Sequence, residues 1–224
     1  MKRLIIPLLF LPVPVVAAMD DDPLLVGLEV DRFEAQESSA QVLEGTVWAG
    51  RDLSRWVMDV ELERERGKTE MLAIDLYQRR PVHPYWNVEV GLRQEPLDGH
   101  SWFSLGVSGL APWFVETEIT LYLKERQSQI VAQFEYELPI TANWMLQALV
   151  EIQVNGDSDG GEGRGSGLAT VESGLQLRYE RFKNIHPYLG FESVDYHGDT
   201  ADYRQRKGEG LDQTVAVIGI AAWF

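Results

Sequence analysis

The chain has 224 residues, a length that suits one domain, and its 20 Lys and Arg against 35 Asp and Glu give a formal net charge of −15. A negative charge of that size argues against nucleic acid as a partner. The lack of cysteine excludes disulfides, thiolate metal sites and a cysteine nucleophile.

The first 18 residues have the features of a secretory signal peptide. Met1-Lys2-Arg3 is basic, the stretch from Leu4 to Val16 is apolar with three prolines, and Ala17-Ala18 supplies small residues at the cleavage position. The alternative is a short membrane anchor, but the apolar stretch is short and broken by proline. We therefore expect a signal peptide over 1–18 and one domain over 19–224.

Period-two alternation of apolar and polar residues dominates the rest of the chain. Residues 56–63, Trp-Val-Met-Asp-Val-Glu-Leu-Glu, show it clearly. The pattern predicts strands over 24–34, 40–50, 54–66, 68–79, 84–95, 100–110, 113–125, 128–139, 142–154, 168–181, 186–196 and 212–224. An even number of runs of about ten residues is typical of bacterial barrels. We predict an all-β fold, a transmembrane outer-membrane antiparallel β-barrel of twelve strands.

The last run, Asp212 to Phe224, is predicted to close this barrel by pairing with the first strand. It is apolar, of strand length, and ends on the aromatic pair Trp223-Phe224, which suits a lipid–water boundary. A soluble β-sandwich is the alternative. Aromatics near many predicted strand ends favour the membrane barrel: Trp56, Tyr85, Trp86, Trp102, Trp113, Trp144 and Trp223.

The predicted connections differ between the two ends of the barrel. Connections after even-numbered strands are short, for example Arg80–His83, whereas the two longest, Gly156–Gly167 and Gly198–Leu211, follow odd-numbered strands and are polar. Short periplasmic turns and long outer loops are typical of such barrels. Both chain ends should then lie on the periplasmic side.

Alternation also predicts an acidic interior, because it turns apolar residues outward and carboxylates inward. The inward acids should be Glu29, Asp31, Glu44, Asp59, Glu61, Asp75, Glu89, Glu116, Glu118, Glu135, Glu137, Glu151, Glu172, Glu180 and Glu192. Two interpretations stay open. The interior is a cation-attracting passage or chamber, or it is a filled, hydrogen-bonded core neutralised by water, Arg93 and Arg178.

The sequence gives little support for catalysis. His83 and His186 fall at the periplasmic end and His100 and His197 at the outer end, and none has a Ser and an acid in a hydrolase-like arrangement. We expect no catalytic residues and no enzyme activity. Met71 and Met145 should point inward, where Met is more often a gap filler than a ligand.

Several segments resemble the copper resistance protein B family, in order over residues 26–224. Arg80-Pro81-Val82-His83-Pro84-Tyr85-Trp86-Asn87 is similar to that family's Arg-Pro-x-x-Pro-Phe-Trp-Asp turn, and Gly109-Leu110-Ala111-Pro112 is similar to its Gly-Leu-Ala-Pro turn. Further similar segments are Gly165–Leu168, Glu172–Glu180, His186–Gly190, Gly198–Asp202 and Trp223–Phe224.

The resemblance implies a copper resistance and homeostasis protein in the outer membrane of a Gram-negative bacterium. Copper would be a bound ion or cargo and not a catalytic cofactor. The candidate interior ligands are Asp75, Glu89, Glu116, Glu135, Glu151, Met71 and Met145, a set able to hold copper only weakly. The alternative function is a general small-cation porin or a non-catalytic scaffold.

The resemblance also bears on partners. Members of the family commonly carry a Met- and His-rich segment before the barrel, but here only residues 19–23 separate the expected signal peptide from the first strand. Either the barrel alone suffices or a periplasmic copper carrier delivers the metal. The other expected partners are outer-membrane lipid and copper ions, and we expect a monomer.

Overall fold

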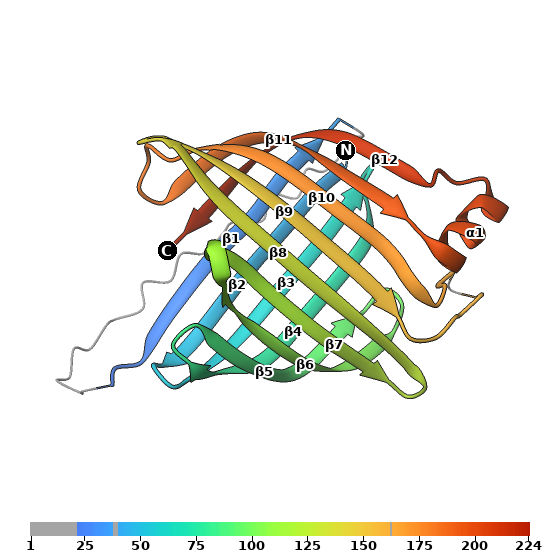
Figure 1. The fold of residues 1–224 in the computed structure, drawn as a ribbon, viewed down its shortest axis with the longest axis horizontal. Coiled ribbons are helices and arrows are strands. Elements are labelled where there is room, and N and C mark those ends of the chain that lie inside the picture. Colours follow the sequence, from blue (N-terminus) through green and yellow to red (C-terminus); the bar gives the residue numbers. More distant parts are fainter. Residues whose placement is uncertain (1–21, 38–39, 162) are drawn as a thin grey trace, which may run out of the picture.

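The computed structural model describes residues 22–37, 40–161 and 163–224. It is a closed antiparallel barrel in which each strand pairs with its neighbours in sequence (Figure 1). The predicted signal peptide, residues 1–18, lies outside the described residues. The strands are β1 (Leu25–Gln36), β2 (Ala40–Arg51), β3 (Ser54–Glu65), β4 (Lys68–His83), β5 (Trp86–Glu95), β6 (His100–Ala111), β7 (Val115–Lys124), β8 (Gln127–Thr141), β9 (Trp144–Asn155), β10 (Gly167–Tyr179), β11 (Ile185–Tyr196) and β12 (Asp212–Trp223).

The twelve-strand prediction is confirmed, with small shifts at the strand ends. One predicted turn is wrong: Arg80–His83 belongs to β4, because the pairing continues to His83 opposite Trp86. A register irregularity between Pro81 and His83 accommodates the proline, which cannot donate a ladder hydrogen bond. The turn itself is therefore Pro84-Tyr85.

The predicted closure by the last strand is also confirmed. β12 pairs with β1, and past the end of β12 the Phe224 amide donates to the Leu28 carbonyl at 2.8 Å. The Leu28 amide donates back to the Phe224 carbonyl at 3.0 Å. Because the sheet closes on itself, no strand edge is left unpaired along this seam.

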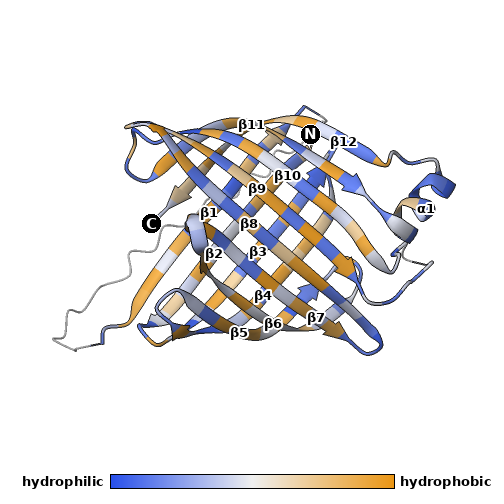
Figure 2. Cartoon of the chain, in the orientation of Figure 1, coloured by the Kyte–Doolittle hydropathy of each residue, from blue (hydrophilic) through white to orange (hydrophobic). Residues whose placement is uncertain are grey.

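The alternation of side chains separates an apolar outer face from a polar interior. Figure 2 shows hydrophobic and hydrophilic residues alternating along the strands. On β6, for example, Trp102, Ser104 and Ser108 are buried, whereas Phe103 and Leu105 between them are exposed. An outward apolar surface of this kind suits contact with lipid rather than water.

Exposed aromatic side chains gather at the end of the barrel where β1 begins, β12 ends and the short turns lie. They include Trp56, Tyr85, Trp113, Phe114, Trp144, Phe182, Trp223 and Phe224. Trp113 and Phe114 lie in η1 (Pro112–Phe114), the short 3-10 turn between β6 and β7. Trp102 does lie near a strand end, as predicted, but it does not belong to the exposed aromatic ring, because its side chain is only 1% exposed and faces the interior. A belt of exposed aromatic side chains like this one is the arrangement that membrane barrels use at a lipid–water boundary.

The opposite end carries the long connections, and one of them corrects the sequence analysis. The predicted loop Gly198–Leu211 contains the helix α1 (Gly198–Lys207), which packs beside β10 (Figure 1). Asp199 lies in its first turn, three basic residues lie in its last turn, and Gly208 caps it in the left-handed conformation. Within the part of the chain that the structure describes, no helix is both long and apolar enough to span a membrane.

Gly219 on β12 is expected to resist substitution because the interior is packed tightly against it. A Cβ there would lie 2.5 Å from the Tyr188 ring and 2.9 Å from Glu34 Cγ, whereas at Gly174 on β10 the nearest atom lies 3.8 Å away. Overpacking of this kind costs about 1–3 kcal/mol. Gly219→Ala should therefore lower the free energy of unfolding by that amount in a urea titration of the barrel in detergent micelles. Gly174→Ala is the matched control, and equal stabilities for the two variants would contradict the prediction.

Candidate functional site

The interior of the barrel contains two ion-pair networks, and the first is centred on Arg32 of β1. Its guanidinium binds Glu34 at 3.0 Å, Glu44 of β2 at 2.9 Å and Glu192 of β11. Glu34 also accepts hydrogen bonds from the Tyr188 hydroxyl at 2.6 Å and from Gln176 Nε2 at 3.2 Å. We call this group, Arg32, Glu34, Glu44, Gln176, Tyr188 and Glu192, the Arg32 cluster. It reaches from β2 to β10 across the closing seam.

The sequence analysis missed Arg32 and Glu34 for a local structural reason. The register of β1 shifts between Val30 and Arg32 against β2, and between Val30 and Phe33 against β12. Such a bulge interrupts the period-two alternation, so Asp31 and Arg32 can both contribute to the interior. No glycine or proline marks the bulge, and alternation alone could not have found it.

The second network is centred on Arg93 of β5, which the sequence analysis did place inside. Arg93 binds Asp75 of β4 at 3.1 Å, Glu61 of β3 at 3.2 Å and Glu95 at 3.2 Å. We call Arg93 and these three acids the Arg93 cluster. A further pair lies beside it, in which Arg79 donates to Glu89 at 2.6 Å. Arg79 was also missed as an interior cation.

Two of the predicted copper ligands are already bound by these arginines. Asp75 and Glu89 do lie inside and are buried, but each already forms an ion pair with an arginine. Glu89 also accepts a hydrogen bond from Ser108 Oγ at 2.6 Å. Charge-assisted hydrogen bonds are the strong ones, so a metal ion must compete with them for these two carboxylates.

The other predicted carboxylates occupy inward register positions without such pairing, and one of them, Glu116, is exposed near the start of β7. Glu116 of β7 lies opposite Glu135 of β8, and Glu151 of β9 lies opposite Glu172 of β10. Glu151 accepts a hydrogen bond from Gln133 at 3.0 Å. Among the residues that the structure describes, none of these four acids forms an ion pair. Directly opposed inward residues have Cβ atoms about 5 Å apart, so each pair presents two carboxylates to one another.

The seven predicted ligands are not brought together at one point. Met71 lies opposite Glu63 near the end of the barrel that carries α1, whereas Met145 lies opposite Arg178 near the end where β1 begins and β12 ends. Across residues 22–37, 40–161 and 163–224 there is no group of three or more His, Asp or Glu arranged to hold a metal ion. A compact, tightly binding metal centre is therefore not a feature of the described interior.

Arg178, the second predicted interior cation, plays a smaller part than Arg93. Among the described residues it forms one ion pair, with Glu137 at 3.4 Å, and it lies over the Tyr188 ring at 6.0 Å. With Glu29, Asp31, His186 and Trp223 it lines a recess of about 260 Å³ at the end of the barrel where β12 ends. This recess joins two carboxylates and an imidazole at one end of the interior.

Near the opposite end, Trp102 of β6 is buried in the interior. Its indole Nε1 donates to Glu95 of the Arg93 cluster at 2.9 Å. The Arg164 guanidinium lies 4.8 Å and the Lys124 ammonium 5.2 Å from its ring centre, which are cation–π contacts. The Trp102 ring and the two cations thus occupy part of the interior beneath the long connections. This arrangement agrees with side chains that fill part of the core at the end that carries α1.

Comparison with known proteins identifies close relatives of this barrel. A family model described as "Copper resistance protein B precursor (CopB)" matches residues 24–224. The "Copper resistance protein B homolog" of Pseudomonas syringae pv. tomato is 32% identical over 194 residues, which cover 85% of this chain and 66% of the relative. The "Copper resistance protein B" of Escherichia coli is 33% identical over 180 residues, which cover 79% and 61%.

The chain thus spans less than two thirds of the length of either relative. Among solved structures, the NanC porin in its rhombohedral crystal form has a TM-score of 0.57 at 13% identity. The match covers 87% of this chain and 98% of the porin chain. A likeness at that identity supports the barrel fold alone.

Proposed function

The chain belongs to the copper resistance protein B family, and we propose that it serves copper resistance as an outer-membrane barrel whose interior carboxylates hold copper ions weakly and reversibly. Its outward apolar face and its ring of exposed aromatics suit a bilayer. The signal peptide expected over residues 1–18 suits export. The proposal assigns copper the place of a bound ion or cargo and gives no residue a catalytic step.

The observation that carries this proposal is a set of two opposed acid pairs, Glu116–Glu135 and Glu151–Glu172, that form no ion pair among the described residues of a barrel of this family. A divalent ion between two opposed carboxylates relieves the repulsion between them. Carboxylates bind copper less firmly than imidazole or thioether ligands do. Passage requires sites that an ion can leave as well as occupy, and weak oxygen ligands meet that requirement.

The second candidate function is the non-catalytic scaffold, or a general small-cation porin with the same fold. The Arg32 and Arg93 clusters favour a scaffold over an open porin, because they fill interior space with side chains that bind one another. Bilayer recordings separate the candidates. A porin shows open-channel steps that copper does not change, a scaffold shows no steps, and the copper barrel responds to micromolar to millimolar copper, about the range of weak sites.

Copper tolerance of a strain that lacks the gene tests the proposal. Wild-type barrel should restore growth on copper, whereas a variant that neutralises the two acid pairs should restore little of it. The interior variant carries Glu116→Gln, Glu135→Gln, Glu151→Gln and Glu172→Gln. The matched control removes the same number of charges from exposed positions, with Glu70→Gln, Asp98→Asn, Asp157→Asn and Asp202→Asn.

Equal amounts of folded barrel in the membrane must be confirmed for both variants by gel mobility before and after heating. Full rescue by the interior variant would remove the interior acids from the mechanism. Failure of the control to rescue would show that net charge, and not the interior, sets tolerance.

A further inference from the structure

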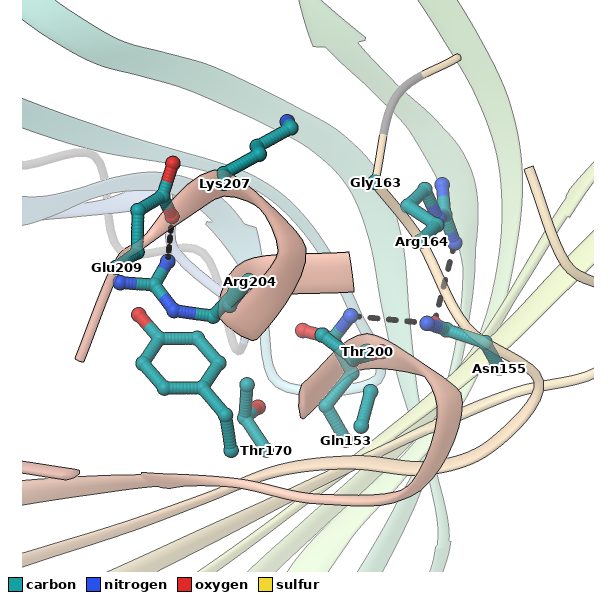
Figure 3. Close-up of a pocket in the computed structure, with 11 residues that line it drawn as sticks. Gln153, Asn155, Gly163, Arg164, Thr170, Thr200, Arg204, Lys207 and Glu209 are labelled. Carbon is teal, nitrogen blue, oxygen red and sulfur yellow. Dashed lines mark hydrogen bonds and ion pairs between the residues drawn. The ribbon is translucent and has the colours of Figure 1, made fainter. Parts of the chain in front are cut away.

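A second pocket lies at the end of the barrel that carries the long connections. It lies between α1, residues 163–164 and the ends of β9, β10 and β11, and its volume is about 230 Å³ (Figure 3). Three cations line it: Arg164, Arg204 and Lys207. Among the residues that the structure describes, Glu209 is the one acid that lines it. The balance of charge is therefore the reverse of that in the whole chain, where acids outnumber bases by 35 to 20.

The wall formed by Arg164 is fixed to the barrel. Arg164 Nη2 donates to Asn155 Oδ1 at 3.2 Å and to Gln129 Oε1 at 3.0 Å, and Asn155 Nδ2 donates to the Gly165 carbonyl at 3.0 Å. Asn155 is 2% exposed, so these bonds are shielded from water. The segment that carries Arg164 is thereby held at the opening rather than extended into solvent.

The wall formed by α1 is joined to that segment. The Gly165 amide donates to Thr200 Oγ1 at 2.9 Å, and a Cβ at Gly165 would lie only 2.1 Å from the Thr200 amide nitrogen. Glycine is therefore needed for this close approach of the two backbones. Figure 3 shows Arg204 and Lys207 of α1 on the opposite side of the pocket from Arg164.

The cations on α1 are available to a ligand. Arg204 stacks over the Tyr196 ring at 3.8 Å and donates from Nε to the Gly210 carbonyl at 3.0 Å. Its only ion pair among the described residues is with Glu209 at 3.1 Å. The Glu209 side chain is 43% exposed, so its ion pair with Arg204 contributes little free energy and an incoming ligand can replace it. Lys207 forms no ion pair or hydrogen bond within the described part of the chain, and its ammonium lies over Gly163.

We propose that this pocket binds a small dissolved oxyanion of the phosphate class, held by Lys207, Arg204 and Arg164. A guanidinium group can donate two hydrogen bonds to two oxygens of one phosphate, and an ammonium adds a compact positive charge. The volume lies below the range of drug-sized ligand sites and suits a small ion. Gln153, Asn155, Thr170 and Tyr196 line the pocket from inward register positions, so it faces the interior and not the bilayer. These features favour a dissolved anion over a lipid headgroup.

Titration of the refolded barrel with inorganic phosphate tests the proposal. The barrel is held in uncharged detergent without phosphate, binding is followed by calorimetry, and sodium chloride keeps the ionic strength constant. We expect saturable binding by the wild type. Lys207→Gln should weaken it at least about tenfold, the effect of losing one charge-assisted hydrogen bond. Arg206→Gln is the matched control, since Arg206 lies on the same helix over the Tyr203 ring and does not line the pocket.

Lys207 is exposed, so its substitution should leave the fold intact. Equal affinity of Lys207→Gln and wild type would overturn the proposal, as would a lack of saturable binding. In a separate arm, a phosphate-bearing outer-membrane lipid is added to the micelles in place of inorganic phosphate. Binding in that arm alone would overturn the assignment to a dissolved ion. Copper takes no part in these measurements, so the result is independent of the proposed copper function.

Discussion

Replacing Arg32 by Met is expected to lower the free energy of unfolding by about 3–5 kcal/mol, the cost of breaking a buried ion-pair network from one side. The change leaves Glu34, Glu44 and Glu192 in the interior without their shared cation. Glu34 is only 2% exposed, so its charge cannot be solvated where it stands. Unfolding in urea, followed by tryptophan fluorescence in detergent micelles, measures the change.

Two further variants make the interpretation specific. Arg126→Gln removes an exposed arginine in the β7–β8 turn and should change stability by no more than about 0.5 kcal/mol. Adding Glu34→Gln and Glu44→Gln to Arg32→Met removes two of the stranded charges and should recover much of the loss. An Arg32→Met barrel as stable as Arg126→Gln would show that the Arg32 cluster does not hold the interior together.

Trp102→Ala is expected to destabilise the barrel by about 3–5 kcal/mol and to open the interior at the end that carries α1. Trp102 is 1% exposed, and its removal leaves a large void beside the Arg93 cluster. Arg164 and Lys124 also lose the ring over which they lie. Single-channel recording should therefore show larger or more frequent conductance steps for Trp102→Ala than for the wild type.

Trp102→Phe is the matched variant. It keeps an aromatic ring beneath the two cations but removes the indole donor to Glu95. We expect it to lose about 1–3 kcal/mol for the missing hydrogen bond to Glu95, which keeps its ion pair with Arg93, and to keep a conductance close to that of the wild type. Identical conductance for Trp102→Ala and wild type would contradict the view that this side chain fills part of the interior.

The sequence was sufficient to predict the fold, because the alternation of residues along each strand decides which side chains face the interior of the barrel. Period two places Trp56 and Met58 outside with Val57 inside, and an even number of such runs ending in Trp223-Phe224 predicts closure. The helix α1 was missed, although Asp199, the basic last turn and Gly208 are recognisable helix-end signals. Its residues are polar on all sides, so no apolar periodicity marked it.

The interior could be predicted only in part, because its pairings depend on distant residues. Alternation placed Asp75 and Glu89 inside but could not show that Arg93 and Arg79 neutralise them. The bulge in β1 hid Arg32, whose partner Glu192 is 160 positions away in the chain. The opposed pairs Glu116–Glu135 and Glu151–Glu172 follow from strand register, which single runs of alternation leave open.

Copper content at dialysis equilibrium tests the proposed role of the interior most directly. Refolded wild-type barrel and the four-Gln interior variant are dialysed together against copper(II), and the metal bound to each is measured. We expect the wild type to hold copper that a chelator removes readily, and the interior variant to hold much less. Equal copper in the two barrels, or none in the wild type, would contradict the account.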